Sequence, residues 1–187
     1  WSDTILIGPG LGQNDLTKEL VKKIVTNYTK PLIIDADGLR CFTEDLRLFK
    51  EIKSDCIITP HHGELARLIK ITTSVLSKNI IEYLQKFMDE FIGTLVAKNA
   101  PTLIAHGNEI VVNPTGNQGL ATGGTGDVLA GVIASFLAQG MPTSIAAELG
   151  VFIHGKAADN VVKRKGYRGL IASDLLDSLP QAIMTYE

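Results

Sequence analysis

The chain has 187 residues, of which 45% are hydrophobic and 20% are charged, and its formal net charge is −2. This composition is typical of a single globular domain over residues 1–187 with a sizeable core, and the charge balance gives no indication of a nucleic-acid or membrane surface. No apolar run is long enough to span a bilayer, and no signal peptide precedes the first strand. The cysteines Cys41 and Cys56 are isolated, form no metal-ligand pattern, and predict reduced thiols in a cytoplasmic protein.

Hydrophobic periodicity predicts short strands that alternate with helices. The predicted strands are 4–7, 32–34, 56–58 and 94–96, followed by a hairpin of 103–105 and 110–112 across the turn 106–108. The predicted helices lie around 16–25, 43–49, 63–68, 80–91, 127–139, 144–162 and 173–185. This alternation is typical of the α/β class, with a mostly parallel sheet covered by helices on both faces.

Four of the predicted strands end in polar or glycine-rich loops, which are 8–12, 35–38, 59–64 and 98–102. In a parallel α/β sheet, ligands bind beyond the carboxyl ends of the strands. We therefore expect these loops to meet at one edge of the sheet, beside the helix that begins near Gly126.

The run Thr-Gly-Gly-Thr-Gly-Asp at 122–127 leads directly into an apolar helix. Its glycines let backbone N–H groups approach an anion, and the first helical turn has N–H groups without intrahelical partners. The run therefore predicts a cradle for phosphate oxygens or a developing oxyanion, although it fits neither a Walker A loop nor the dinucleotide fingerprint. Two interpretations of Asp127 stay open: it removes a proton from a hydroxyl that takes a phosphoryl group, or it caps the helix.

The other loops also have two interpretations each. Gly12 either lets a substrate approach closely or forms a tight turn. Asp35 and Asp37 bind magnesium through water, line the site, or cap the short helix that follows. Lys98, directly after an apolar strand, either reaches nucleotide phosphates or is a solvated surface lysine.

The loop 59–64 contains two adjacent histidines and an acid, whose spacing does not suit a zinc site. His61 and Arg67 are candidates for contact with the phosphates or the amide of a substrate. Glu64 is placed where an acid is favoured by the helix dipole, and this role is compatible with a functional one. His154, in a helix rich in alanine and glycine, is expected to be a satisfied core or interface histidine.

The motifs Gly-Pro-Gly-Leu-Gly at 8–12, Ile-Asp-Ala-Asp-Gly at 34–38, Thr-Pro-His-His-Gly-Glu at 59–64 and Gly-Thr-Gly-Asp at 124–127 resemble those of the ADP/ATP-dependent NAD(P)H-hydrate dehydratase family. This family is part of the ribokinase-like superfamily, and the resemblance covers nearly the whole chain. It implies a three-layer α/β/α sandwich with a mostly parallel central sheet, and it implies that the N-terminal part of the usual domain is missing from this sequence.

The resemblance also implies a reaction and a site. ADP or ATP, with Mg²⁺, phosphorylates the hydroxyl of hydrated NADH or NADPH, and phosphate then leaves to restore the nicotinamide ring. Asp127 is the implied catalytic base. The implied substrate-binding residues are Gly12, His61, Glu64, Arg67 and Asp127. The implied nucleotide-binding residues are Lys98, Asn99, Ala100, Pro101, Thr102, Thr122, Gly123, Gly124, Thr125 and Gly126. No residue is predicted as a metal ligand, and Asn99 stands where the family usually has glycine.

The resemblance further implies a cytoplasmic homo-oligomer, for example a tetramer, and an NAD(P)H-hydrate epimerase that is either fused or separate. An alternative is a small-molecule kinase similar to the hydroxyethylthiazole and hydroxymethylpyrimidine kinases, which share the Gly-Thr-Gly-Asp motif. The product distinguishes the two, because a kinase leaves a stable phosphorylated alcohol. A third alternative, a nucleotide-binding module without activity, is disfavoured by the intact Asp127.

Overall fold

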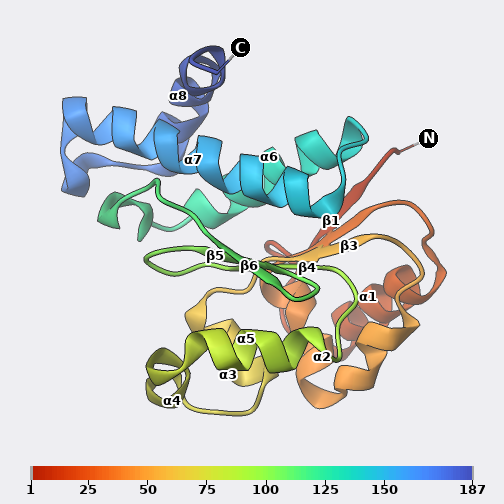
Figure 1. Ribbon diagram of the computed structural model, residues 1–187. Coiled ribbons are helices and arrows are strands. Elements are labelled where there is room, and N and C mark those ends of the chain that lie inside the picture. Colours follow the sequence, from red (N-terminus) through yellow and green to blue (C-terminus); the bar gives the residue numbers. More distant parts are fainter. Residues whose placement is uncertain (1, 187) are drawn as a thin grey trace.

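The computed structural model describes residues 2–186, so the terminal residues 1 and 187 lie outside it, and Figure 1 shows a central sheet between two layers of helices. The strands are β1 (Ile5–Ile7), β2 (Leu32–Ile34), β3 (Cys56–Ile58), β4 (Thr94–Ala97), β5 (Leu103–His106) and β6 (Glu109–Val112). They lie side by side in chain order, with β1 to β4 parallel and β5 and β6 antiparallel. The predicted class, parallel strands and hairpin are confirmed.

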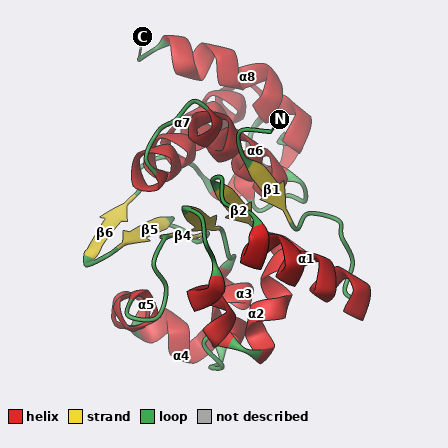
Figure 2. Cartoon of the chain, turned by 90° about the vertical axis from the view of Figure 1, so that its right-hand side faces the viewer, coloured by secondary structure: helices red, strands yellow, loops and turns green. Residues whose placement is uncertain are grey.

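The helices form one layer on each face of the sheet, as the two views in Figures 1 and 2 show. The first layer holds α1 (Asp15–Asn27), α2 (Arg40–Glu44), α3 (His62–Leu68), α4 (Thr73–Lys78) and α5 (Ile80–Met88). On the other face, α6 (Thr125–Ala138) and α7 (Thr143–Lys165) pack against the sheet, and α8 (Ala172–Met184) packs on α6 and α7. Short 3₁₀ turns are η1 (Ala36–Leu39), η2 (Leu46–Glu51), η3 (Gln118–Leu120) and η4 (Tyr167–Gly169). None of the helices within residues 2–186 has the length and apolar character needed to cross a membrane.

The central strands are apolar throughout because both of their faces are covered. Ile33 and Ile57 are fully buried in the core under α6 and α7, whereas Ile34 and Ile58 are fully buried in the core on the other face. Successive side chains of a strand point to opposite faces, so a continuous apolar run fills both cores at once. Each buried isoleucine contributes about 1.5–3 kcal/mol relative to an exposed one.

The segment 43–49, predicted as one short helix, forms the ends of two elements instead. α2 ends at Glu44 and η2 begins at Leu46, because Asp45 between them is extended, with φ of −143°. The Asp45 carboxylate accepts the N–H of Arg47 at 3.0 Å and so caps η2. A short side chain that caps the next turn thus breaks the expected helix.

Other differences from the predicted elements are small. The helix predicted over 80–91 ends at Met88, and the hairpin turn is shorter than 106–108 because His106 belongs to β5. The short helix α4 was not predicted, and its residue Leu76 is its one buried side chain. Its two apolar residues, Val75 and Leu76, are adjacent and do not establish a helical period.

The loops that follow β1 to β4 meet at one edge of the sheet, as predicted. A Cβ atom on Gly8 would lie 1.7 Å from the Asp35 carbonyl oxygen, so only glycine fits there. The Lys98 N–H donates to the Pro60 carbonyl oxygen at 2.9 Å, and the Lys98 side chain reaches Asp35. These contacts join all four loops at the carboxyl ends of the parallel strands.

Candidate active site

The glycine-rich run forms the start of α6. Gly124 caps the helix in the left-handed conformation, with φ of 86°, which favours glycine. Thr125 is the first helical residue and Asp127 the third, so the interpretation of Asp127 as the helix cap is wrong. The Asp127 side chain is exposed and forms no hydrogen bond or ion pair within residues 2–186. Its carboxylate is therefore available to a ligand.

Two threonine hydroxyls, one of them on the buried Thr125, hydrogen-bond to the preceding turn and fix the shape of this run. The Thr122 hydroxyl donates to the Gly119 carbonyl oxygen at 3.0 Å, and the Thr125 hydroxyl donates to that of Leu120 at 2.7 Å. These threonines therefore shape the loop through their side chains. Within the run 122–127, the backbone N–H groups that donate to no acceptor in residues 2–186 are those of Thr122, Gly123, Gly124, Gly126 and Asp127. Unpaired N–H groups at a helix start offer a binding surface for an anion.

Lys98 lies against the same helical turn. Its Nζ is 2.7 Å from Oδ1 of Asp35, and the Asp35 side chain is 1% exposed. A Cβ atom on Gly126 would lie 3.4 Å from the Lys98 Nζ, so the ammonium group touches the start of α6. The interpretation of Lys98 as a solvated surface lysine is wrong, because its side chain is only 19% exposed.

The remainder of the loop 98–102 lies beyond β4 on the same sheet edge. Asn99, Ala100 and Pro101 are exposed, and the Thr102 hydroxyl donates to the Asn99 carbonyl oxygen at 3.1 Å. Asparagine at position 99 thus takes part in the turn through its backbone. Within this loop, Lys98 is the residue that contacts the anion cradle, the group of unpaired N–H groups at the start of α6.

The loop after β3 starts α3 with a reciprocal cap. Nδ1 of His61 accepts the N–H groups of Gly63 and Glu64, at 3.0 Å and 3.3 Å, and the Glu64 carboxylate accepts the His61 N–H at 2.7 Å. The predicted helix-start role of Glu64 is confirmed. Since Nδ1 accepts these bonds, a neutral His61 carries its proton on Nε2. The His61 ring and Arg67, on the last turn of α3, are exposed.

Gly12 lies in the loop after β1, where it meets the loop after β2. Its φ is 76°, and its N–H donates to Oδ2 of Asp37 at 3.0 Å. Oδ1 of Asp37 accepts from the Gln13 side chain at 2.8 Å. The predicted tight turn is confirmed, and a Cβ atom on Gly12 would meet nothing within 4 Å, so the space beside it is open.

His154 of α7 is the hydrogen-bonded core histidine that the sequence predicts. Its partner, the Thr125 carbonyl group, belongs to the first residue of α6, so His154 also contacts the candidate site. Its Nε2 donates to the carbonyl oxygen of Thr125 at 3.0 Å, and the residue is 5% exposed. Burial lowers the pKa of His154 to about 4; the bond to Thr125 acts in the opposite direction, and the charge of Lys98 lowers the pKa further. A neutral imidazole thus supports the first residue of α6 from below.

The segment 113–117, which sequence reasoning did not single out, anchors the chain just upstream of the glycine-rich run. The Asn117 side chain donates to Asp159 of α7 at 2.8 Å, and Thr115 packs where α7 has glycine. A Cβ atom on Gly155 would lie 2.2 Å from the Thr115 hydroxyl oxygen. The signal in the sequence was the cluster of turn residues in Asn-Pro-Thr-Gly-Asn at 113–117, upstream of the run at 122–127.

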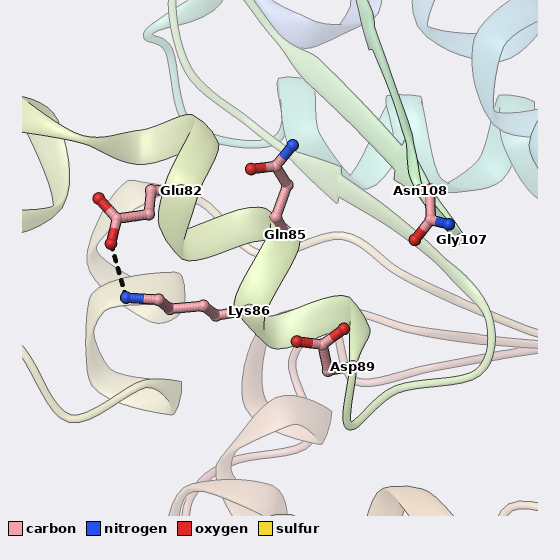
Figure 3. A pocket seen from close by; sticks show the side chains of 6 residues that line it. All are labelled: Glu82, Gln85, Lys86, Asp89, Gly107 and Asn108. Carbon is pink, nitrogen blue, oxygen red and sulfur yellow. Dashed lines mark hydrogen bonds and ion pairs between the residues drawn. The ribbon is translucent and has the colours of Figure 1, made fainter.

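Two surface hollows differ in their relation to this edge. One, of about 490 Å³, lies between α6 and α8 and is bordered by Asp127 together with apolar side chains such as Val132 and Leu179. The other, of about 290 Å³, lies between α5 and the β5–β6 turn (Figure 3). It is at the opposite end of the sheet, and its Glu82 and Lys86 pair with each other at 2.6 Å. The second hollow therefore does not belong to the site.

Asp35 and Asp37 are the carboxylates at this edge that the sequence offers as magnesium ligands. No group of three or more His, Cys, Asp or Glu side chains within residues 2–186 is arranged to hold a metal ion. Asp35 is paired with Lys98, and both carboxylate oxygens of Asp37 accept hydrogen bonds. Both side chains are thus engaged within the protein, and no residue is assigned as a Mg²⁺ ligand.

Comparisons with known proteins agree on one family. A family model described as NAD(P)H-hydrate dehydratase matches residues 1–181. The bifunctional NAD(P)H-hydrate repair enzyme Nnr of Moorella thermoacetica is 38% identical over 99% of this chain, which spans 35% of that relative's length. The ADP-dependent (S)-NAD(P)H-hydrate dehydratase of Neisseria meningitidis is 38% identical over 91% of this chain and 59% of its own length. The chain thus spans about a third of the bifunctional relative.

Solved structures give the same result for the fold. The ADP/ATP-dependent NAD(P)H-hydrate dehydratase of Bacillus subtilis, co-crystallised with ATP/Mg²⁺, has a TM-score of 0.89 and 32% identity over 99% of this chain and 65% of its own. A ribokinase-like superfamily protein of Enterococcus faecalis has a TM-score of 0.83 and 30% identity over 98% of this chain and 63% of its own. A hydroxyethylthiazole kinase of Pyrococcus horikoshii has a TM-score of 0.76 but only 20% identity, covering 98% of this chain and 75% of its own, so it shares the fold alone.

Proposed function

The chain belongs to the NAD(P)H-hydrate dehydratase family, and from this premise we propose that the protein dehydrates hydrated NADH or NADPH with ADP or ATP as the driving nucleotide. The fold is the ribokinase-like three-layer sandwich. The observation that carries the proposal is the start of α6, where unpaired N–H groups lie beside the exposed Asp127. This arrangement combines an anion cradle with a proton acceptor, as phosphoryl transfer to a hydroxyl requires.

In the proposed first step, the terminal phosphoryl group of the nucleotide lies against the N–H groups of Gly123, Gly124 and Gly126. Asp127 takes the proton of the substrate hydroxyl as the new O–P bond forms and the phosphoanhydride bond breaks. The N–H groups and the Lys98 ammonium offset the negative charge on the transferring oxygens. The threonines at 122 and 125 contribute by holding the loop in this shape.

In the second step, the electron pair of the ring nitrogen expels the phosphate by breaking the C–O bond. Loss of a proton from the neighbouring ring carbon then restores the double bond. The products are NADH or NADPH, inorganic phosphate, and AMP from ADP or ADP from ATP. The overall reaction is that of a lyase, although its first step is a phosphoryl transfer.

We assign the exposed groups of the first and third loops to the hydrated dinucleotide. Gly12 offers open space, and His61 and Arg67 offer exposed donors, with Glu64 fixing the His61 backbone. We assign the loop after β4 to the nucleotide, that is Lys98, Asn99, Ala100, Pro101 and Thr102. This division is supported by the contact of the Lys98 ammonium group with the start of α6. The backbones of His61 and Lys98 lie side by side at the ends of neighbouring strands, so the two binding regions adjoin there.

Mg²⁺ enters the proposal with the nucleotide, where it neutralises phosphate charge. The relative from Bacillus subtilis was co-crystallised with ATP/Mg²⁺. Asp35 is engaged with Lys98, and Asp37 is engaged with Gly12 and Gln13, so neither carboxylate is assigned to the ion.

The proposal is tested with the full-length protein, hydrated NADH or NADPH, and either ADP or ATP. Recovery of the dihydronicotinamide absorbance together with inorganic phosphate is the expected result. A stable phosphorylated alcohol without recovered absorbance would instead indicate a small-molecule kinase. Comparing initial rates with ADP and ATP, and with the two dinucleotides, gives the preferences of the enzyme.

The proposal extends to assembly and compartment. We expect a homo-oligomer, and an epimerase activity that is either fused to this domain or supplied by a separate protein, because several relatives are named bifunctional NAD(P)H-hydrate repair enzymes. We place the protein in the cytoplasm, on the ground that both cysteines are unbridged. Sedimentation and an epimerase assay of the full-length protein test the first two expectations.

A further inference from the structure

Asp35 stands at the carboxyl end of β2 and is almost completely buried, with a side chain that is 1% exposed. Its place in the strand alternation puts it on the same face as Ile33, toward α6 and α7. A buried carboxylate is costly unless it is paired, and its partner is the Lys98 ammonium at 2.7 Å. We propose that Asp35 is a positioning residue that holds the Lys98 ammonium against the start of α6, where it meets the phosphoryl oxygens of the nucleotide. This inference rests on the proposed function.

The geometry of the ammonium group supports this role. Lysine has a flexible four-carbon side chain and three rotatable N–H donors, so the side chain alone does not fix the position of the ammonium group. One donor of Lys98 is fixed by Asp35, which leaves two for an anion. The position of the group, 3.4 Å from where a Cβ atom on Gly126 would lie, places these donors next to the unpaired N–H groups of the cradle.

Two other roles of Asp35 predict different behaviour. If Asp35 only neutralises Lys98, its removal leaves more positive charge at the cradle and strengthens the binding of an anion. If Asp35 only stabilises the fold, its removal affects nucleotide binding through the backbone whether or not Lys98 is present. Positioning predicts weaker binding, and predicts that the loss disappears when Lys98 is absent.

The experiment is a double-mutant cycle on the full-length protein, with ADP affinity measured by calorimetry. We expect Asp35→Asn and Lys98→Met each to weaken ADP binding by about 10-fold or more, the scale of a lost charge-assisted contact. In the Lys98→Met background, Asp35→Asn is expected to weaken the affinity for ADP by no more than about two-fold. The double variant has no unpaired buried charge and is therefore the best folded of the three.

Glu90→Gln is the matched control, because it breaks the surface pair of Glu90 with Lys50, 2.5 Å apart, and should leave ADP affinity unchanged. Tighter ADP binding by Asp35→Asn overturns the inference, as does an equal loss of affinity in both backgrounds. If Asp35→Asn alone does not fold, the comparison of Lys98→Met with the double variant still decides, since weaker ADP binding by the double variant overturns positioning. A wild-type protein that binds neither ADP nor ATP contradicts the proposed function itself.

Discussion

Replacing His154 with glutamine tests whether the imidazole beneath α6 is held in its neutral form. Burial lowers the pKa of His154 to about 4, from an ordinary value of 6.5. The unfolded chain takes up a proton near the ordinary value, so this group contributes its full stability above that pH. The contribution is lost as the pH falls toward the folded pKa. The difference between the two values corresponds to about 3 kcal/mol in all, and to about 2 kcal/mol between about pH 7 and about pH 5.

The assay is urea denaturation of the full-length wild-type protein and of His154→Gln across this pH range. Glutamine can keep an N–H donor for the Thr125 carbonyl oxygen but cannot take up a proton. We expect the free energy of unfolding of the wild type to fall by about 2 kcal/mol more than that of the variant between about pH 7 and about pH 5. His106→Gln removes an exposed imidazole and is the matched control. Parallel pH curves for wild type and His154→Gln would refute the reasoning.

Asp127→Asn is expected to leave ADP affinity nearly unchanged by calorimetry and to lower turnover about 10²–10⁴-fold, as for other positioned proton acceptors; near-normal turnover would remove Asp127 from the mechanism. Gly126→Val should weaken ADP binding, because the added side chain covers N–H groups and presses on the Lys98 ammonium; unchanged affinity with a normal melting temperature would place the nucleotide elsewhere. His61→Asn should raise the KM for hydrated NADH and leave ADP affinity unchanged, because asparagine keeps an acceptor for the helix cap. His61→Ala also loses that acceptor and with it about 1 kcal/mol of stability. If His61→Asn weakened only ADP binding, His61 would belong to the nucleotide site.

The strands could be predicted because each is a short apolar run between clear boundaries. Leu32–Ile34, for example, is preceded by Pro31 and followed by Asp35, and it is buried on both faces. The break at Asp45 could not be predicted, because an aspartate is compatible with two local structures. The residue can continue a helix, or its carboxylate can cap the turn that follows, as it does here. That choice depends on how α2 and η2 pack, which local periodicity does not report.

The loops of the site could be predicted from the same boundaries, since parallel strands deliver their carboxyl ends to one edge. The contacts between side chains of different loops and helices could not be predicted. Lys98 and Asp35 are 63 residues apart in sequence, and His154 is 29 residues from Thr125. Each contact depends on which strand lies beside which and on how a helix crosses the sheet. The sequence also did not indicate which glycine of the run has a positive φ. It is Gly124, whereas the backbone of Gly126 is helical.

α7 sets the geometry of the cradle from behind, because it holds both ends of the segment that leads into α6. Asp159 accepts from the N–H of Gly116 at 3.2 Å and from the Asn117 side chain at 2.8 Å, while His154 donates to Thr125. The two α7 side chains are five residues apart on one helix, which also packs against the sheet. Since packed interiors deform little, the position of the N–H groups follows from a rigid helix and not from the glycine-rich loop alone. Such a loop can therefore be preorganised for an anion before the nucleotide binds, which is the condition for strong electrostatic stabilisation of a transition state.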